Sequence, residues 1–121
     1  MTSADKAIRI AQICDDNKAR DVEVFEVSRL CSFTDHLVIA TGLSLTHMRA
    51  TTENLAREMK QDGLRPLGLE GFEPPGPWVL ADYGDVVVHL FLEETRKYYN
   101  LERLWGDAPR LAWQESPHAG G

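Results

Sequence analysis

The residues with the greatest chemical capacity lie between positions 81 and 94. This stretch holds four acids and one histidine: Asp82, Asp85, His89, Glu93 and Glu94. Carboxylates and imidazoles are the groups that bind metal ions or transfer protons as general acid and base. The same residue types also have structural uses, because aspartate closes turns, histidine packs in sheets and acids favour the start of a helix.

A metal site needs three or four donors that converge on one point. Asp82 and Asp85 flank a Tyr-Gly pair, where aspartate commonly accepts backbone N–H groups. His89 interrupts an apolar run, and alternation places it on the same strand face as Val87 and Phe91. We therefore favour structural roles and expect no metal, with metal binding at His89 as the open alternative.

The elements that carry these side chains follow from apolar periodicity. A period near 3.6 predicts helices over 4–19, 44–63 and 93–107. Alternating or β-branched runs predict strands over 21–30, 35–42, 65–72, 78–83 and 86–92. This order predicts the α/β class, with one five-stranded mixed β-sheet that carries three helices.

Helix ends and loops carry their own signals. Ser3 and Ser44 are suitable N-caps, and Gly63 stands where a left-handed residue commonly ends a helix. The proline-rich segment 73–77 predicts a turn. In the last helix the predicted buried stripe consists of Tyr98, Leu101, Leu104 and Trp105.

The chain of 121 residues fits one domain, 43% hydrophobic and 26% charged. Residues 109–121 lack periodicity, so we expect a folded domain over 1–108 followed by a disordered tail. No apolar run reaches the roughly 20 residues of a membrane helix. The N-terminus mixes charges among its apolar residues, unlike a signal peptide. The distant Cys14 and Cys31 indicate free thiols in a reducing cytoplasm.

The net charge of −6 is unevenly distributed, because residues 68–108 contain 8 acidic and 3 basic residues. Direct nucleic-acid binding commonly uses a basic stripe that displaces phosphate counterions, and the sequence has none. We therefore expect no direct sequence-specific binding of nucleic acid. The acidic half favours a basic partner. The alternative is that surplus carboxylates only keep the domain soluble.

The segment "TGLSLTH" (41–47) has the strand–glycine–helix order of a phosphate-binding turn, but only one glycine and no lysine. No Asp-x-Asp pair follows that could hold the metal ions of a nucleotidyltransferase. Ser44 and His47 lie one helical turn apart, a spacing that simple capping explains. The pattern favours a protein without enzymatic activity or cofactor, with a nucleotidyltransferase-like enzyme or nucleotide-binding protein as the alternative.

The strand over 78–83 offers a candidate binding surface. Trp78, Leu80 and Asp82 share one face by alternation, and Glu70 on the preceding strand can join them. An aromatic anchor with flanking acids is typical of a protein–protein hot spot that selects a basic partner. The alternative buries Trp78 in the core. For a hairpin in simple register we expect His89 on the opposite face from Trp78.

The chain resembles the ribosomal silencing factor family, also called the Iojap family. The resemblance rests on "DVEVFEVSRL", "TDHLVIATGLSLTHM", "GLEG" and "WVLADYGDVVVHLFLEETRKYYNLERLWGDA". These pieces span about residues 5–108, and the last of them is long and specific. The resemblance implies a nucleotidyltransferase-like fold without the catalytic acids, and no enzymatic activity.

The resemblance also implies a partner. Members of this family bind large-subunit ribosomal protein number fourteen at the subunit interface, block subunit joining and repress translation when nutrients are short. Carried onto this sequence, the contact residues are Trp78, Leu80, Asp82, Tyr83 and Glu70, with Ser44 and His47 as weaker candidates. The resemblance allows a homodimer. Organellar relatives of this family act in ribosome assembly, but no transit peptide precedes this domain, so we expect a bacterial cytoplasmic protein.

Overall fold

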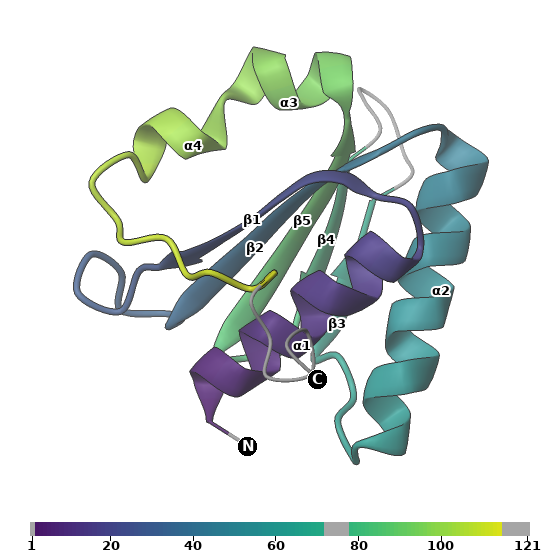
Figure 1. The fold of residues 1–121 in the computed structure, drawn as a ribbon, viewed down its shortest axis with the longest axis horizontal. Helices are drawn as coiled ribbons and strands as arrows, with labels where there is room; N and C mark the ends of the chain where they lie inside the picture. Colours follow the sequence, from purple (N-terminus) through teal and green to yellow (C-terminus); the bar gives the residue numbers. More distant parts are fainter. Residues whose placement is uncertain (1, 72–77, 115–121) are drawn as a thin grey trace.

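The structure is a computed structural model that describes residues 2–71 and 78–114. The predicted turn at 73–77 and the last seven residues lie outside the described part. The elements in chain order are α1 (Ser3–Asp16), β1 (Arg20–Glu26), β2 (His36–Gly42), α2 (Leu45–Gln61), β3 (Gly68–Glu70), β4 (Trp78–Asp82), β5 (Val86–Leu92), α3 (Glu93–Tyr99) and α4 (Leu101–Leu104) (Figure 1). No described helix is both long and apolar enough to cross a bilayer.

The five strands form one mixed sheet in the order β1-β2-β5-β4-β3. The central pair, β2 and β5, is parallel, and every other neighbouring pair is antiparallel. Parallel strands need a crossover connection, which the segment from α2 to β4 provides. The predicted α/β class with a five-stranded mixed sheet is confirmed, although the third predicted helix is divided into α3 and a short α4.

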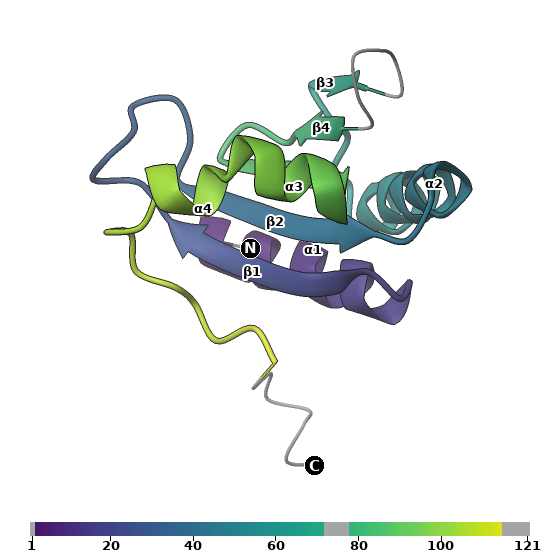
Figure 2. The ribbon, with the colours of Figure 1, turned by 90° about the horizontal axis from the view of Figure 1, so that it is seen from above.

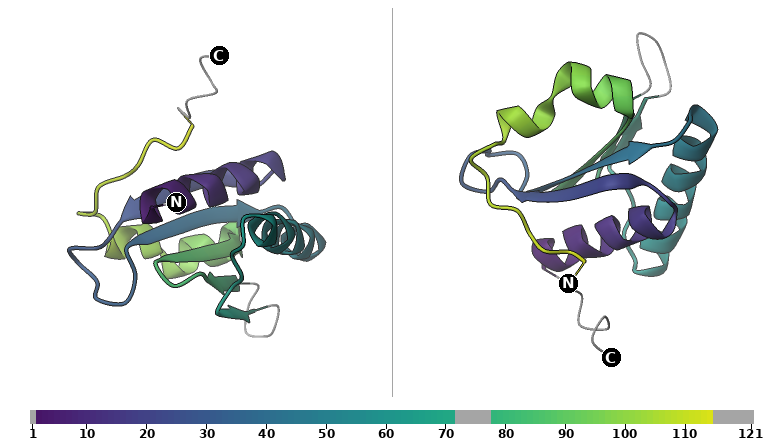
Figure 3. Two further views of the ribbon diagram at one scale, coloured as in Figure 1. Left: turned by 90° about the horizontal axis from the view of Figure 1, so that it is seen from below. Right: turned by 45° about the horizontal axis from the view of Figure 1, so that its top comes forward.

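Helices cover the two faces of the sheet differently (Figures 2 and 3). On the first, which we call the α1–α2 face, α1 and α2 pack on valines and alanines of the sheet. On the second, the α3 face, the chain after β5 passes over a smaller cluster: Phe25, Val27, Leu37, Ile39, Val87, Phe91 and Ala108. Trp78 and Leu80 of β4 pack at the margin of this cluster and are only partly buried.

Capping residues fix where the long helices begin. The hydroxyl of Ser44 accepts a hydrogen bond from the His47 N–H at 3.0 Å, which confirms the predicted cap of α2. Gly63 adopts a φ of +79°, as predicted for the residue that ends this helix. The cap of α1 is Thr2 rather than Ser3, in a reciprocal capping box with Asp5.

The predicted helix over 93–107 is interrupted. Asn100 adopts a left-handed φ of 46° and ends α3, and α4 begins at the next residue. The predicted buried stripe is therefore wrong, since Tyr98 is 82% exposed and Leu104 is 70% exposed. Trp105 is partly buried on the α3 face, and the side chain of Leu101 lies outside the described part. Tyr98 is exposed on α3 itself, and the positive φ at Asn100 then redirects the chain before Leu104 and Trp105.

Residues 109–114 do not form the expected disordered tail. They run along β1, where Pro109 O accepts from Glu26 N–H and Leu111 N–H donates to Val24 O (Figure 3). Trp113 is 7% exposed within the core beside α1, and its indole N–H donates to Val22 O at 2.9 Å. The folded unit therefore extends at least to Trp113. These contacts join parts of the chain that are distant in sequence, so they leave no periodic signal.

Candidate protein-binding face

The candidate face is the part of the α3 face formed by β3 and β4. Trp78, Leu80 and Asp82 alternate along β4 and are each partly exposed. Glu70 on β3 is paired with Leu80 and is exposed on the same side. The predicted grouping of an aromatic, an aliphatic and two acidic side chains on one strip of sheet is therefore present in the structure.

Aromatic contacts hold Trp78 in place from behind and from one side. Its ring centroid lies 5.4 Å from that of Phe91, which is fully buried, and 4.8 Å from that of Tyr99 on α3. Such tilted pairs lie within the favourable separation for aromatic rings. Trp78 is thus an anchored side chain with one part packed in the core and another part accessible, which combines the binding and the core interpretations.

His89 lies on the same face as Trp78, so the expectation that it faces the other way is wrong. The hairpin pairs Leu80 with His89 and Trp78 with Phe91. Residues directly opposite each other in an antiparallel pair point to the same side of the sheet. The hairpin pairs in the expected register. The expectation was wrong because it placed residues of the two paired strands on opposite faces.

The imidazole of His89 fixes the indole of Trp78. Its Nδ1 accepts the Trp78 Nε1–H at 3.0 Å, which requires a neutral ring with the proton on Nε2. Burial lowers the pKa of His89 to about 4, because the charged imidazolium is poorly solvated there. His89 is therefore neutral at physiological pH and accepts the hydrogen bond. Its ring lies behind Trp78, on the side away from solvent.

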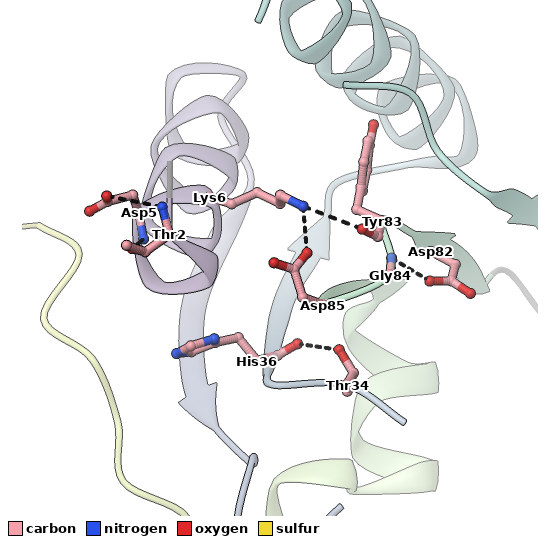
Figure 4. A network of polar contacts seen from close by, with 9 residues as sticks. All are labelled: Thr2, Asp5, Lys6, Thr34, His36, Asp82, Tyr83, Gly84 and Asp85. Carbon is pink, nitrogen blue, oxygen red and sulfur yellow. Dashed lines mark hydrogen bonds and ion pairs between the residues drawn. The ribbon is translucent and has the colours of Figure 1, made fainter. Parts of the chain in front are cut away.

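Asp82 and Asp85 have structural partners in the turn between β4 and β5 (Figure 4). Asp82 Oδ1 accepts the Gly84 N–H at 2.8 Å, and Gly84 has a φ of +87°. Asp85 forms an ion pair with Lys6 of α1. Within residues 2–71 and 78–114, no group of three or more metal-binding side chains converges.

Three further predicted contact residues lie away from this face. Tyr83 is 6% exposed within the core of the α1–α2 face, and burial raises the pKa of its hydroxyl to about 12. Ser44 caps α2. His47 accepts the Leu43 N–H through Nδ1 and lies 2.6 Å from Asn17 O through Nε2, so it joins the start of α2 to the end of α1. None of these three side chains joins the strip formed by Trp78, Leu80 and Glu70.

Tyr99 and His89 are the residues that sequence reasoning missed. Tyr99 is the last residue of α3 and contacts Trp78 because that helix packs over this side of the sheet. His89 could have been found, since a two-residue turn at Gly84 and Asp85 pairs Leu80 with His89 by counting outward.

A separate cavity of about 350 Å³ opens at the carboxyl ends of β2 and β5, where open α/β sheets commonly bind ligands. Asp21, Glu93 and Glu94 line it beside Arg20. This is an acidic lining, unlike a phosphate cradle.

The neighbouring guanidinium of Arg96 is 7% exposed and already engaged. It donates to Asp21 O at 2.7 Å, to Thr41 Oγ1 at 2.8 Å and to Glu102 at 2.8 Å. Arg96 thereby ties α3 and α4 to the two strands beneath them. These contacts stabilise the α3 face, and they use the guanidinium donors that could otherwise bind a ligand in the cavity.

Both cysteines are free, as expected. Cys14 is buried in the core of the α1–α2 face, where burial raises the pKa of its thiol to about 12. Cys31 is partly buried at the edge of the α3 cluster.

The amino-acid sequence is similar to a known protein family and to several of its members. A family model described as "Ribosomal silencing factor during starvation" matches residues 1–120. The ribosomal silencing factor RsfS of Bacillus subtilis is 38% identical over 99 residues, which cover 82% of this chain and 83% of that protein. The match of the family model includes the segment 109–114 that packs on β1.

A solved structure and a more distant sequence extend the comparison. A crystal structure of a protein from Chromobacterium violaceum superposes with a TM-score of 0.79 at 34% identity, covering 88% of each chain. A mouse protein named "Mitochondrial assembly of ribosomal large subunit protein 1" is 37% identical over 90 residues, which are 72% of this chain and 39% of that protein.

Proposed function

Because this chain belongs to the ribosomal silencing factor family, we propose that it represses translation by binding the large ribosomal subunit. In this proposal its direct partner is large-subunit ribosomal protein number fourteen, at the surface where the small subunit docks. The bound domain overlaps the incoming subunit and prevents joining. The blockade needs no chemistry, and its extent follows the protein's concentration relative to its dissociation constant.

The observation that carries the proposal is the strip formed by Trp78, Leu80, Asp82 and Glu70. A partly exposed tryptophan held from behind by packed side chains resembles the anchors that dominate protein interfaces. Its position is fixed before binding, so little side-chain entropy is lost on association. The two acids further along the same strip, Asp82 and Glu70, suit a basic ribosomal protein.

Replacement of Trp78 by alanine tests the proposal. We expect Trp78→Ala to weaken binding to the isolated ribosomal protein by at least about 2 kcal/mol, or roughly 30-fold, the level of a hot spot. Surface plasmon resonance measures the affinity, and light scattering of mixed subunits measures their joining. Circular dichroism establishes that the variant is folded.

Leu69→Ala is the matched control, because Leu69 is an exposed apolar residue on the adjacent strand whose side chain points to the other side of the sheet. It should retain wild-type affinity. A folded Trp78→Ala variant that binds the ribosomal protein and blocks joining like the wild type would refute the proposed face.

A further inference from the structure

The chain between the end of α3 and α4 forms a second surface next to the proposed binding face. An open hollow of about 620 Å³ lies there, lined by Lys97, Tyr98, Tyr99, Asn100, Arg103 and Leu104. Its lining contains two bases and no acid. The whole chain carries a net charge of −6, so this basic lining differs in sign from the molecule as a whole, although acids such as Glu93 lie next to it.

Both bases are available to an external anion. Lys97 is 78% exposed, and among the described residues it forms an ion pair with Glu93 at 3.6 Å, a surface pair of the kind that contributes little. Arg103 is exposed and makes no side-chain ion pair within the described residues. The two cations flank Tyr98, which is 82% exposed.

The hollow is continuous with the proposed face through aromatic rings. Tyr98 meets Tyr99 edge-on at 5.1 Å between centroids, and Tyr99 meets Trp78 at 4.8 Å. When a partner binds Trp78, the groups next to its contact surface therefore come within reach of Lys97 and Arg103. On a ribosomal subunit those groups include the phosphates of ribosomal RNA.

We propose that the α3–α4 hollow binds ribosomal RNA of the large subunit, with Lys97 and Arg103 on phosphates and Tyr98 against a base or sugar. Cations combined with an exposed aromatic ring are what sequence-independent RNA contacts use. This inference rests on the proposed function, because two phosphate contacts on an acidic protein are too weak alone. They add to the protein contact as a second, tethered interaction.

The charge contribution is tested by the salt dependence of binding to purified large subunits. The double variant Lys97→Gln/Arg103→Gln should bind large subunits more weakly than the wild type at low salt. It should also lower the slope of log K against log salt by about 0.7 to 0.9 per lost phosphate contact. Affinity for the isolated ribosomal protein should be unchanged.

The matched control is Arg57→Gln/Lys60→Gln, which removes the same charge from the exposed side of α2. Its salt slope should equal that of the wild type. If wild-type protein binds subunits and Lys97→Gln/Arg103→Gln keeps the wild-type slope, the RNA contact is refuted while the proposed function stands. If wild-type protein binds neither subunits nor the isolated ribosomal protein, both fail.

Photo-crosslinking identifies the class of macromolecule. With benzoylphenylalanine in place of Tyr98, the crosslinked product on large subunits should be sensitive to ribonuclease. A product whose mass is unchanged by ribonuclease and corresponds to this protein joined to a ribosomal protein would overturn the proposal.

Discussion

A single hydrogen bond sets the orientation of the largest side chain on the proposed face. Trp78 Nε1–H donates to His89 Nδ1 at 3.0 Å, and only the neutral imidazole offers that acceptor. Protonation of His89 replaces the acceptor by a donor and places a charge in the core. The tryptophan anchor is therefore coupled to the protonation state of a residue that itself lies behind the accessible surface.

This coupling predicts a pH dependence of stability. Burial lowers the pKa of His89 from 6.5 to about 4, so the unfolded state binds the proton more tightly than the folded state. The contribution of neutral His89 is fully present above pH 6.5 and is lost as the pH falls toward 4. The loss amounts to at most about 3 kcal/mol, from about 1.4 kcal/mol per pKa unit.

Urea unfolding of wild type and His89→Gln between pH 7 and pH 4 checks this prediction. Glutamine does not titrate, and its carbonyl can still accept the Trp78 N–H. The stability difference between the two proteins should therefore change with pH in favour of the variant as the solution becomes acidic. Parallel curves for the two proteins would contradict the prediction.

At the scale of elements, the segment 109–114 contributes to stability through its contacts with β1, which include one isolated β-bridge between Phe25 and Arg110. Trp113 is almost fully buried and hydrogen-bonded to β1, and loss of a buried tryptophan commonly costs about 3 to 5 kcal/mol. We expect removal of residues 109–121 to lower the melting temperature by well over 5 °C.

Differential scanning calorimetry of three chains separates the contributions. One chain ends at Ala108, one ends at Gln114, and one carries Trp113→Ala in the full length. The chain ending at Ala108 should lose at least as much stability as Trp113→Ala. A chain ending at Ala108 that melts with the wild type would show that the contacts of 109–114 contribute nothing.

The elements that were predictable from sequence are those with local signals. The long stripe and the Ser44 cap define α2, and the alternation of Val22 and Val24 against Phe25 assigns β1 to its two faces. The end of α3 at Asn100 was missed because the apolar pattern continues across it. The strand-like segment 109–114 was missed because its partners lie about 85 residues earlier and impose no period on it.

The candidate site was predictable to the extent that it follows strand alternation. Trp78, Leu80 and Asp82 share one side because a strand has period two. Tyr83, the next residue, fell in the core of the other side for the same reason. The support from Tyr99 depends on how α3 ends and packs, which is a tertiary property and carries no local signature.

At the scale of the whole molecule, the charge distribution predicts how the protein finds its partner. Asp82 is partly exposed on the same side of β4 as Trp78, in a half of the chain rich in acids. Asp82→Asn should slow association with the basic ribosomal protein and flatten the salt dependence of the rate, while dissociation changes little. The amide oxygen of asparagine can still accept the Gly84 N–H, so the turn is retained.

Stopped-flow or surface plasmon resonance at two salt concentrations measures this effect. Asp62→Asn is a control that removes one acid at the end of α2, where it contacts Arg9. An association rate for Asp82→Asn that equals the wild-type rate at low salt would argue against steering by this residue.

The segment 109–114 has a consequence for the protein at high concentration. An uncovered edge strand offers unpaired backbone groups to other chains and promotes aggregation. On the outer side of β1, the Glu26 N–H and the carbonyls of Val22 and Val24 are occupied by residues of this segment. The opposite edge, β3, is only three residues long. Because one edge of the sheet is covered and the other is short, we expect the protein to reach high concentrations without edge-to-edge pairing between copies.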